Sequence, residues 1–330
     1  YIENISSTNP CGEQPLPPYG ACLLGSFNLT RYMIRRGDQW VFDIEWFNSD
    51  IPVIVRMMDN VIDETIYPLH EQEQEAKNKR RMGLGITGLA NVLGAIGIRY
   101  GSREAQAFTE NILYTLSVGC YEASAMLAKE KGAFPLFDKE KYLQSKFVQK
   151  MPYKVRELIR THGIRNSHLT SIAPTGTISL TANNVSSGIE PVFSLEYTRT
   201  VQTADGPMYE TVQDYAMREW GVKCVTADKI TAEEHVAMLN SAQKWVDSSV
   251  SKTCNIGSDV SFDEFKEVYL MAYDGGAKGC TTFRAAGKRF GILNASASEE
   301  VIEEEQQPDE TEVEGGACYI DIETGIRSCE

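Results

Sequence analysis

Apolar residues recur every three or four positions along several stretches of the chain, and this spacing predicts amphipathic helices. The clearest stretch is 102–131 (SREAQAFTENILYTLSVGCYEASAMLAKEK), with Ser102 as the N-cap and Gly132 as the stop. A second helix is expected over 50–66, with Asp50 as its N-cap and Pro52 in its first turn. Shorter helices are expected near 152–162, 208–220, 231–250 and 262–274.

Short apolar runs lie between these helices and predict strands. The runs are CLLGSFNL, SHLTSIA, PVFSLEY, KTCNIG and CTTFR. Helix and strand therefore alternate along the chain, which predicts an α/β architecture. No internal repeat of solenoid period is present in the sequence.

The composition changes near residue 295, which divides the chain into three expected parts: 1–294, 295–316 and 317–330. The first part has the apolar content of a folded domain. The second is acidic and nearly free of large apolar groups, so we expect a disordered linker. The third carries Cys318 and Cys329. A flexible tether that ends in two thiols suggests a redox tail, and a frayed tail without function is the alternative.

Bulk composition excludes some classes of protein. The chain has 330 residues, of which 42% are hydrophobic and 24% charged, and its formal charge is −14. This charge argues against a nucleic-acid partner but allows a small anion held by backbone amides. No apolar run reaches membrane-spanning length and no signal peptide opens the chain, so we expect a cytoplasmic protein. The chain begins at Tyr1 without Met, so we expect a fragment, a processed chain or a piece of a longer protein.

Eight cysteines are spread along the chain, and none forms a C-x-x-C pair. A structural zinc site is therefore not expected, and no metal-ligating residues are assigned. Free thiols fit a reducing cytosolic compartment. We expect Cys120, Cys224 and Cys254 to pack in the core.

The segment NPCGE (9–13) places a thiol between an amide and a carboxylate. In extended geometry Asn9, Cys11 and Glu13 would point the same way. Pro10 and Gly12 favour an exposed loop or its tip. One interpretation is a turn with an incidental cysteine, and the other is a reactive sulfur flanked by a hydrogen-bonding amide and a base.

Two glycine-containing turns resemble phosphate-binding loops. GLGITG (83–88) matches G-x-G-x-x-G, but HEQEQEAKNKRRM before it is not a buried strand, so we reject a dinucleotide site. Its glycines more simply permit close packing at a strand-to-helix joint.

APTGTISL (173–180) follows a predicted strand, so its backbone N–H groups could cradle an anion at a strand-to-helix turn. An ordinary turn is the alternative. The candidate contacts are Pro174, Thr175, Gly176, Thr177, Ile178 and Ser179.

Several blocks together carry a family resemblance: TNPCGEQPLPPYGACLLGSFNL, RRMGLGITGLANVL, RNSHLTSIAPTGTISL, SSGIEPVF, SKTCNI and AYDGGAKGCTTFR. They resemble the catalytic subunit of ribonucleotide reductase, most closely the adenosylcobalamin-dependent (class II) type. The blocks run in family order from residue 9 to about 284. The resemblance implies that 1–294 is the C-terminal half of a ten-stranded α/β barrel with a central finger loop that carries the radical cysteine.

The implied activity is the reduction of ribonucleotides, as di- or triphosphates, to 2′-deoxyribonucleotides for DNA synthesis. By resemblance, a thiyl radical on Cys11 removes the 3′-hydrogen, Glu13 is the base for the 3′-OH proton, and Asn9 hydrogen-bonds the sugar hydroxyls. Cys22 matches one of two thiols that end as a disulfide. Its partner lies on an earlier strand that this chain lacks.

The resemblance also assigns the remaining segments. Residues 174–179 match the substrate phosphate cradle, and Cys318 and Cys329 resemble tail thiols that re-reduce the active site, although more widely spaced than the family's close pair. The implied partners are a ribonucleotide, a thioredoxin-like or glutaredoxin-like reductant, the N-terminal half of the catalytic subunit, and a second copy of the complete enzyme in a homodimer. Alone, the chain should not turn over.

Three features bear on the radical source. Oxygen-dependent relatives carry two adjacent tyrosines where this chain has Thr281 and Thr282, and TGIRSCE lacks a glycyl-radical motif. Both departures favour adenosylcobalamin, without a histidine ligand to cobalt. Cys280 lies beside this segment, and core packing is its simpler interpretation. The alternatives for the whole chain are a non-catalytic nucleotide-binding or regulatory module and an oxygen-dependent reductase with an unusual relay.

Overall fold

The computed structural model describes residues 1, 3–203, 206–257, 260–284, 293–295, 318–320 and 327–329. The chain divides into two compact units, Tyr1–Ala295 and Ser296–Glu330. Within the described residues, no helix is both long and apolar enough to cross a membrane.

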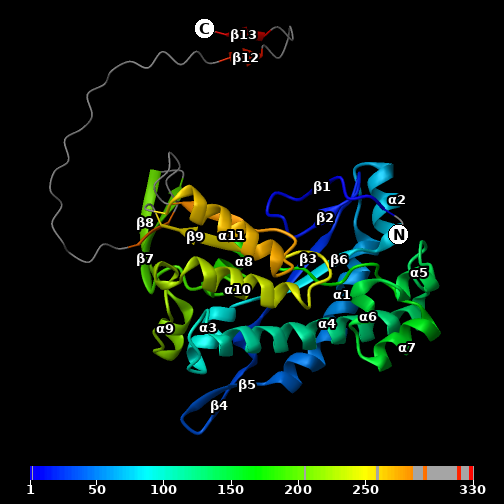
Figure 1. The fold of residues 1–330 in the computed structure, drawn as a ribbon, viewed down its shortest axis with the longest axis horizontal. Coiled ribbons are helices and arrows are strands. Elements are labelled where there is room, and N and C mark those ends of the chain that lie inside the picture. Colours follow the sequence, from blue (N-terminus) through cyan, green and yellow to red (C-terminus); the bar gives the residue numbers. More distant parts are fainter. Residues whose placement is uncertain are drawn as a thin grey trace, which may run out of the picture. The chain divides into compact units, whose positions relative to one another are not determined.

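A row of parallel strands organises the first unit (Figure 1). β3 (Leu23–Asn28) pairs in parallel with β6 (Met82–Thr87). Leu84 in β6 forms a parallel bridge with Thr170. Ile172, two residues further on, forms a second parallel bridge with Val250. β9 (Thr253–Ile256) then pairs in parallel with β10 (Thr281–Arg284). The strands and bridged segments lie side by side in the order in which they occur along the chain, which is typical of consecutive β-α-β units.

Glycines make the close approach at β6 possible. A Cβ on Gly85 would lie 2.2 Å from the backbone oxygen of Ser171, so a side chain there would collide with the neighbouring segment. The expected close packing at a strand-to-helix joint is confirmed: Gly83 and Gly85 lie inside the buried strand, and Gly88, with φ of +80°, forms the joint to α3 (Leu89–Ala95). The residues before β6 form the helix α2 (His70–Lys79) and not a strand, as the rejection of a dinucleotide site assumed.

Helices pack beside this row and supply much of the core (Figure 1). The long helix α4 (Arg103–Lys131) packs against α1 (Ile44–Glu64), α7 (Tyr153–His162) and α10 (Ala232–Gln243). The largest fully buried apolar side chains come from both strands and helices; they include Phe47, Phe134, Leu29, Ile51, Met82, Leu84, Ile86 and Ile112. Cys120, Cys224 and Cys254 are buried, as predicted.

The remaining elements connect and flank these layers. The strands are β1 (Ser7–Thr8), β2 (Pro15–Leu16), β4 (Met33–Arg36), β5 (Gln39–Phe42), β7 (Glu196–Thr203), β8 (Gly206–Gln213) and β11 (Leu293–Ala295). The helices are η1 (Leu29–Tyr32), α3 (Leu89–Ala95), α5 (Lys139–Leu143), α6 (Lys146–Gln149), α8 (Gly176–Thr181), α9 (Tyr215–Trp220), η2 (Ala227–Lys229) and α11 (Phe262–Asp274). β4 pairs with β5, and β11, β7 and β8 form an antiparallel sheet.

Several predicted elements are confirmed. α4 begins after its predicted cap, Ser102, whose side chain accepts a hydrogen bond from the Ala105 N–H, and it ends at Gly132. The helices near 152–162 and 262–274 and the strands CLLGSFNL, KTCNIG and CTTFR are also present. SHLTSIA contributes only the bridging residues Thr170 and Ile172.

Other boundaries were wrong for physical reasons. α1 begins at Ile44, because Asp43 accepts the Trp46 N–H at 2.9 Å, while the expected cap Asp50 accepts the Tyr32 hydroxyl instead. Residues 208–213 lie in β8 rather than in a helix, because they pair with β7. That pairing begins at Glu196, so most of the expected strand PVFSLEY is irregular. α10 ends at Gln243 rather than near 250.

The α/β class is confirmed, but the described residues form no closed barrel. Among them β3 pairs only with β6 and β10 only with β9, so the row is open at both ends. In the second unit, β12 (Cys318–Ile320) pairs antiparallel with β13 (Arg327–Cys329), and Cys318 lies opposite Cys329 in the register. Apart from Ala295, the predicted linker 295–316 lies outside the described residues.

Candidate active site

A short hairpin carries the NPCGE segment. β1 and β2 pair antiparallel and leave residues 9–14 as the connecting loop. The Gly12 N–H donates to the Asn9 carbonyl at 3.1 Å, and the Gln14 N–H donates to Asn9 Oδ1 at 3.0 Å. Gly12 has φ of +80°, which favours glycine at this position. The Asn9 side chain therefore closes the loop, a role that the residue pattern did not predict.

Cys11 lies exposed in this loop. Local desolvation and, after it, the negative charge of Glu13 raise the pKa of the Cys11 thiol. A raised pKa keeps the proton on sulfur, so Cys11 is poorly suited to thiolate attack. An exposed S–H group is suited to hydrogen-atom transfer.

Glu13 is buried beside this thiol. Its side chain is 2% exposed, and its Oε2 atom has no hydrogen-bond partner among the described residues. The Ser249 N–H donates to the Glu13 carbonyl at 3.0 Å and so ties the loop to the row of strands. A buried carboxylate oxygen without a partner is costly. The environment of Glu13 therefore favours a polar ligand that donates a hydrogen bond to it.

Cys22 lies directly before β3 and is half-buried. Burial raises the pKa of the Cys22 thiol to about 12; Arg81 opposes the shift, and Asp247 and Glu13 add to it. The charge of Glu13 thus acts on both Cys11 and Cys22.

The turn at 174–179 uses its hydroxyl groups internally. Thr175 has φ of +55°, and its Oγ1 accepts the Gly188 N–H at 2.7 Å and lies 2.9 Å from Thr87 Oγ1. Ser179 Oγ donates to the Gly176 carbonyl at 3.0 Å and contacts Ser187 Oγ at 3.0 Å. These two hydroxyl groups therefore hold the turn in shape.

The other members of the turn are more accessible. Gly176, Thr177 and Ile178 are exposed in the first turn of α8, and Pro174 is half-buried before them. A Cβ on Gly176 would meet no atom within 4 Å. First-turn N–H groups have no partner within a helix, so these amides can meet an anion.

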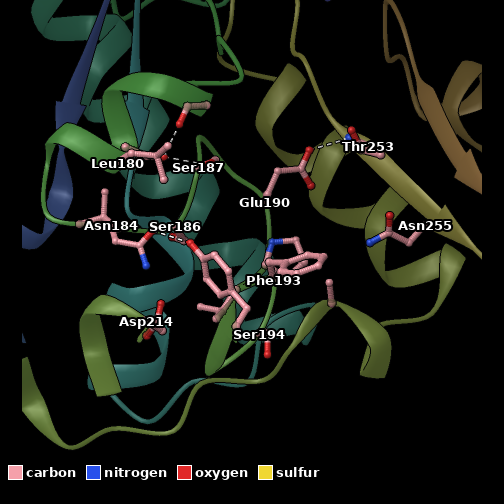
Figure 2. A pocket seen from close by; sticks show the side chains of 17 residues that line it. Leu180, Asn184, Ser186, Ser187, Glu190, Phe193, Ser194, Asp214, Thr253 and Asn255 are labelled. Atoms are coloured by element: carbon pink, nitrogen blue, oxygen red, sulfur yellow. Dashed lines mark hydrogen bonds between the residues drawn. The ribbon is translucent and has the colours of Figure 1, made fainter. Parts of the chain in front are cut away.

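A cavity of about 310 Å³ borders this turn (Figure 2). Gly176 and Ser179 line one side, and Glu190, Thr253 and Asn255 line another. The cavity begins at the turn and extends to Glu190 and Thr253, so a ligand whose phosphate bound the turn could place its other groups in the cavity.

The wall of the cavity contains an ion pair between a fully buried lysine and a partly exposed glutamate, which the residue pattern did not predict. Glu190 Oε1 accepts the Thr253 N–H at 2.6 Å (Figure 2), and Glu190 Oε2 accepts from Lys252 Nζ at 2.5 Å. Lys252 is fully buried and also contacts His235 Nδ1 at 2.7 Å. Burial and, after it, the Lys252 charge lower the pKa of His235 to about 3. One Glu and one Lys that lie far apart in sequence give no local signal of such a pair.

The remaining predicted residues lie elsewhere. Thr281 and Thr282 are in β10, and Thr282 Oγ1 lies 3.0 Å from the Tyr269 hydroxyl. Cys318 and Cys329 belong to the second unit. In the part of the chain whose side chains are described, no three His, Cys, Asp or Glu residues gather as a metal site.

The fold and these side chains define an α/β protein built on a row of parallel strands, with an exposed thiol and a buried carboxyl group on one hairpin loop and a second thiol directly before β3. The family model for the ribonucleotide reductase barrel domain matches residues 1–283. The chain therefore belongs to the ribonucleotide reductase family.

Individual relatives show the extent of the similarity. A vitamin B12-dependent ribonucleoside-diphosphate reductase of Mycobacterium tuberculosis (strain CDC 1551 / Oshkosh) is 32% identical over 353 residues, which cover 99% of this chain and 46% of the relative. One from Thermoplasma acidophilum is 32% identical, over 94% of this chain and 41% of the relative. A ribonucleoside-diphosphate reductase subunit alpha of Chlamydia muridarum is 33% identical, over 52% of this chain and 18% of the relative. The chain spans less than half the length of these relatives.

Proposed function

We propose that the complete protein reduces ribonucleotides to 2′-deoxyribonucleotides by thiyl radical chemistry, and that this chain supplies the C-terminal half of its catalytic barrel. Membership of the family and the open row of parallel strands support this proposal. An N-terminal half would provide the remaining strands and close the ten-stranded barrel around residues 9–14 as a finger loop. The relatives' names favour a ribonucleoside diphosphate over a triphosphate.

The observation that carries the proposal is that the buried Oε2 of Glu13, near the Cys11 thiol, has no hydrogen-bond partner in the described part of the chain. A ribose 3′-hydroxyl would donate to this oxygen, which then takes up its proton. A radical on Cys11 Sγ removes the 3′-hydrogen, and the 2′-hydroxyl leaves as water. Two electrons come from Cys22 and a second thiol in the N-terminal half, which end as a disulfide. Asn9 holds the loop in shape and offers its amide to the sugar.

The substrate phosphates would bind the turn at 174–179. The N–H groups of Gly176, Thr177 and Ile178 and the Thr177 hydroxyl supply donors without a positive side chain. Pro174 fixes the bend, and the hydroxyl groups of Thr175 and Ser179 keep the cradle rigid. The adjacent cavity would accommodate the rest of the nucleotide.

Adenosylcobalamin is the cofactor that the relatives' names favour. Thr281 and Thr282 have no oxidisable ring, so they could not pass a radical on from a second subunit. Cys11 is exposed, so a cofactor bound next to its loop could reach the thiol directly. When bound, adenosylcobalamin supplies the radical equivalent that takes the hydrogen atom from Cys11 Sγ. The Cys11 loop is thus the part of this chain that must face the cofactor.

The second unit would carry electrons to the active site. Opposite residues of an antiparallel pair have Cα atoms about 4.5–5.5 Å apart, within the range of a disulfide. The register of Cys318 and Cys329 therefore suits a redox pair despite their separation in sequence. A thioredoxin-like or glutaredoxin-like protein would reduce this pair. A homodimer of the complete enzyme rests on the family resemblance alone.

The test is deoxynucleotide formation with adenosylcobalamin and a dithiol, by this chain alone and by this chain mixed with the N-terminal half. We expect product only in the mixture, and none with Cys11→Ala. Cys120→Ser is the matched control, because Cys120 is buried in α4, and it should retain activity. If the two halves associate and bind nucleotide without forming product, a non-catalytic nucleotide-binding or regulatory module replaces this proposal. Product formation that is independent of cobalamin would indicate an oxygen-dependent enzyme.

A further inference from the structure

Two cysteines outside the proposed site lie in contact. Cys254 is in β9, and Cys280 directly precedes β10. Their sulfur atoms are 3.6 Å apart, an S–H···S contact. The parallel register places Thr253 opposite Thr281, and the Thr281 N–H donates to the Lys252 carbonyl at 3.1 Å, so both backbones are held in place at this point.

The pair faces away from the cavity. Side chains alternate between the two faces of a strand. Thr253 and Asn255 line the cavity (Figure 2), whereas Lys252, Cys254 and Ile256 are buried. Cys254 therefore points to the opposite face, toward the apolar core. The proposed chemistry at the hairpin loop and the cavity does not use this pair, and the inference below does not depend on the proposed function.

The two thiols differ in access. Cys254 is fully buried at 0% exposure, whereas Cys280 is half-buried and so can be reached from solvent. The hydrogen bond from Cys254 lowers the pKa of the Cys280 thiol, and the charge of Lys252 acts in the same direction. The same hydrogen bond raises the pKa of the Cys254 thiol. Cys280 is thus the attacking thiol and Cys254 the resolving one.

No other cysteine whose side chain the structure describes has such a neighbour. Cys120 and Cys224 are buried as free thiols, and no hydrogen bond joins either to a second sulfur in the described part of the chain. A disulfide needs the sulfur atoms of Cys254 and Cys280, now 3.6 Å apart, to approach by about 1.5 Å.

We propose that Cys254 and Cys280 form a reversible redox dithiol that reacts with small-molecule disulfides. The Cys280 thiolate attacks one sulfur of the small disulfide, forms a mixed disulfide and releases one small thiolate. Cys254 loses its proton to the released thiolate, attacks Cys280 Sγ and expels the second small thiolate, which takes the proton first lost by Cys280. The two protein thiols lose two electrons, and the small disulfide gains them. An excess of dithiol reverses the reaction.

The product would join β9 to the start of β10 covalently. β9 begins at Thr253. The Thr253 N–H and the Nζ of the preceding Lys252 both bond Glu190 and hold it in the cavity wall. Closing the loop between residues 254 and 280 restricts the unfolded chain. We therefore expect the oxidised chain to unfold at a Tm a few degrees higher than the reduced chain.

The test uses the full 330-residue chain with oxidised glutathione as the probe. After native alkylation with N-ethylmaleimide, peptide mapping should find a link between the peptides of Cys254 and Cys280, lighter by two hydrogen atoms. Excess dithiol should remove the link and the rise in Tm. If peptide mapping after oxidation finds the Cys254 and Cys280 peptides unlinked, the proposal is wrong.

Two variants separate the roles of the thiols. Cys254→Ser should trap a glutathione adduct on Cys280, and Cys280→Ser should give neither a link nor an adduct at Cys254. Cys120→Ser is the matched control and should retain the link. If Cys254→Ser does not fold, Cys254→Ala serves in its place, with circular dichroism to check the fold. A Cys280 that stays unmodified in a folded Cys254 variant would overturn the mechanism.

Discussion

Glu13 is buried, and one of its carboxylate oxygens has no hydrogen-bond partner among the residues that the structure describes; both properties bear on its proposed role as a base. Glu13→Gln keeps the shape of the side chain but removes its ability to accept a proton. In the enzyme completed with the N-terminal half, we expect kcat to fall by about 10²–10⁴-fold with KM little changed. Steady-state kinetics measure this, with Glu267→Gln, an exposed change in α11, as the control. A wild-type kcat in Glu13→Gln would exclude the role.

Glu3 predicts a pH dependence of stability. It bonds Lys79 Nζ at 2.7 Å and also pairs with Arg81. Burial favours a higher pKa for Glu3, but Arg81 and Lys79 outweigh it and lower the pKa to about 2. Because the folded pKa is lowered, this stability is present above the unfolded pKa of about 4.3 and is lost as the pH falls toward 2.

Glu3→Gln should therefore reduce the loss of unfolding free energy between pH 4.5 and 2, by up to about 3 kcal/mol. Denaturant unfolding at several pH values measures this difference from the wild-type chain. Glu64→Gln, an exposed change at the end of α1, should follow the wild-type curve. Parallel curves for Glu3→Gln and wild type would contradict the assignment.

At the scale of elements, β6 depends on a glycine that meets a neighbouring backbone. Gly85→Ala would place a methyl group 2.2 Å from the rigid backbone oxygen of Ser171, so we expect a loss of about 1–3 kcal/mol of unfolding free energy. Gly25→Ala in the adjacent β3 is the control, because its Cβ would meet the flexible Met58 Sδ at 3.0 Å. Urea unfolding should show the smaller loss for Gly25→Ala, and equal losses would contradict this account.

Elements with local signals were predicted well, and elements that depend on distant partners were not. Ser102 and Gly132 bound α4 because capping is a contact within a few residues. Residues 208–213 contain apolar side chains at helical spacing, yet they form β8 because β7 supplies a strand to pair with. Asp50 has the composition of a cap but is bonded by Tyr32, which lies on another element.

At the scale of the molecule, Tyr1–Ala295 is a compact unit of its own. Truncation after Ala295 should therefore leave the Tm of this unit within about 2 °C of the wild-type value. If the proposed function holds, the truncated chain, completed with the N-terminal half, should turn over with a small dithiol but not with a thioredoxin-like protein. Calorimetry and product assays measure the two effects. A large fall in Tm would show that the second unit stabilises the first.

By itself, the sequence determined the α/β class, the family and the candidate chemistry, because alternating periodicity and short ordered motifs are local properties of the chain. Only the tertiary structure decided that Glu13 is buried with an oxygen that no described residue bonds, and that its charge acts on both Cys11 and Cys22. The Lys252–Glu190 pair and the Cys254–Cys280 contact arise in the same way. Each joins residues from separate segments, and such contacts depend on strand register and chain crossing, which no short window of sequence encodes.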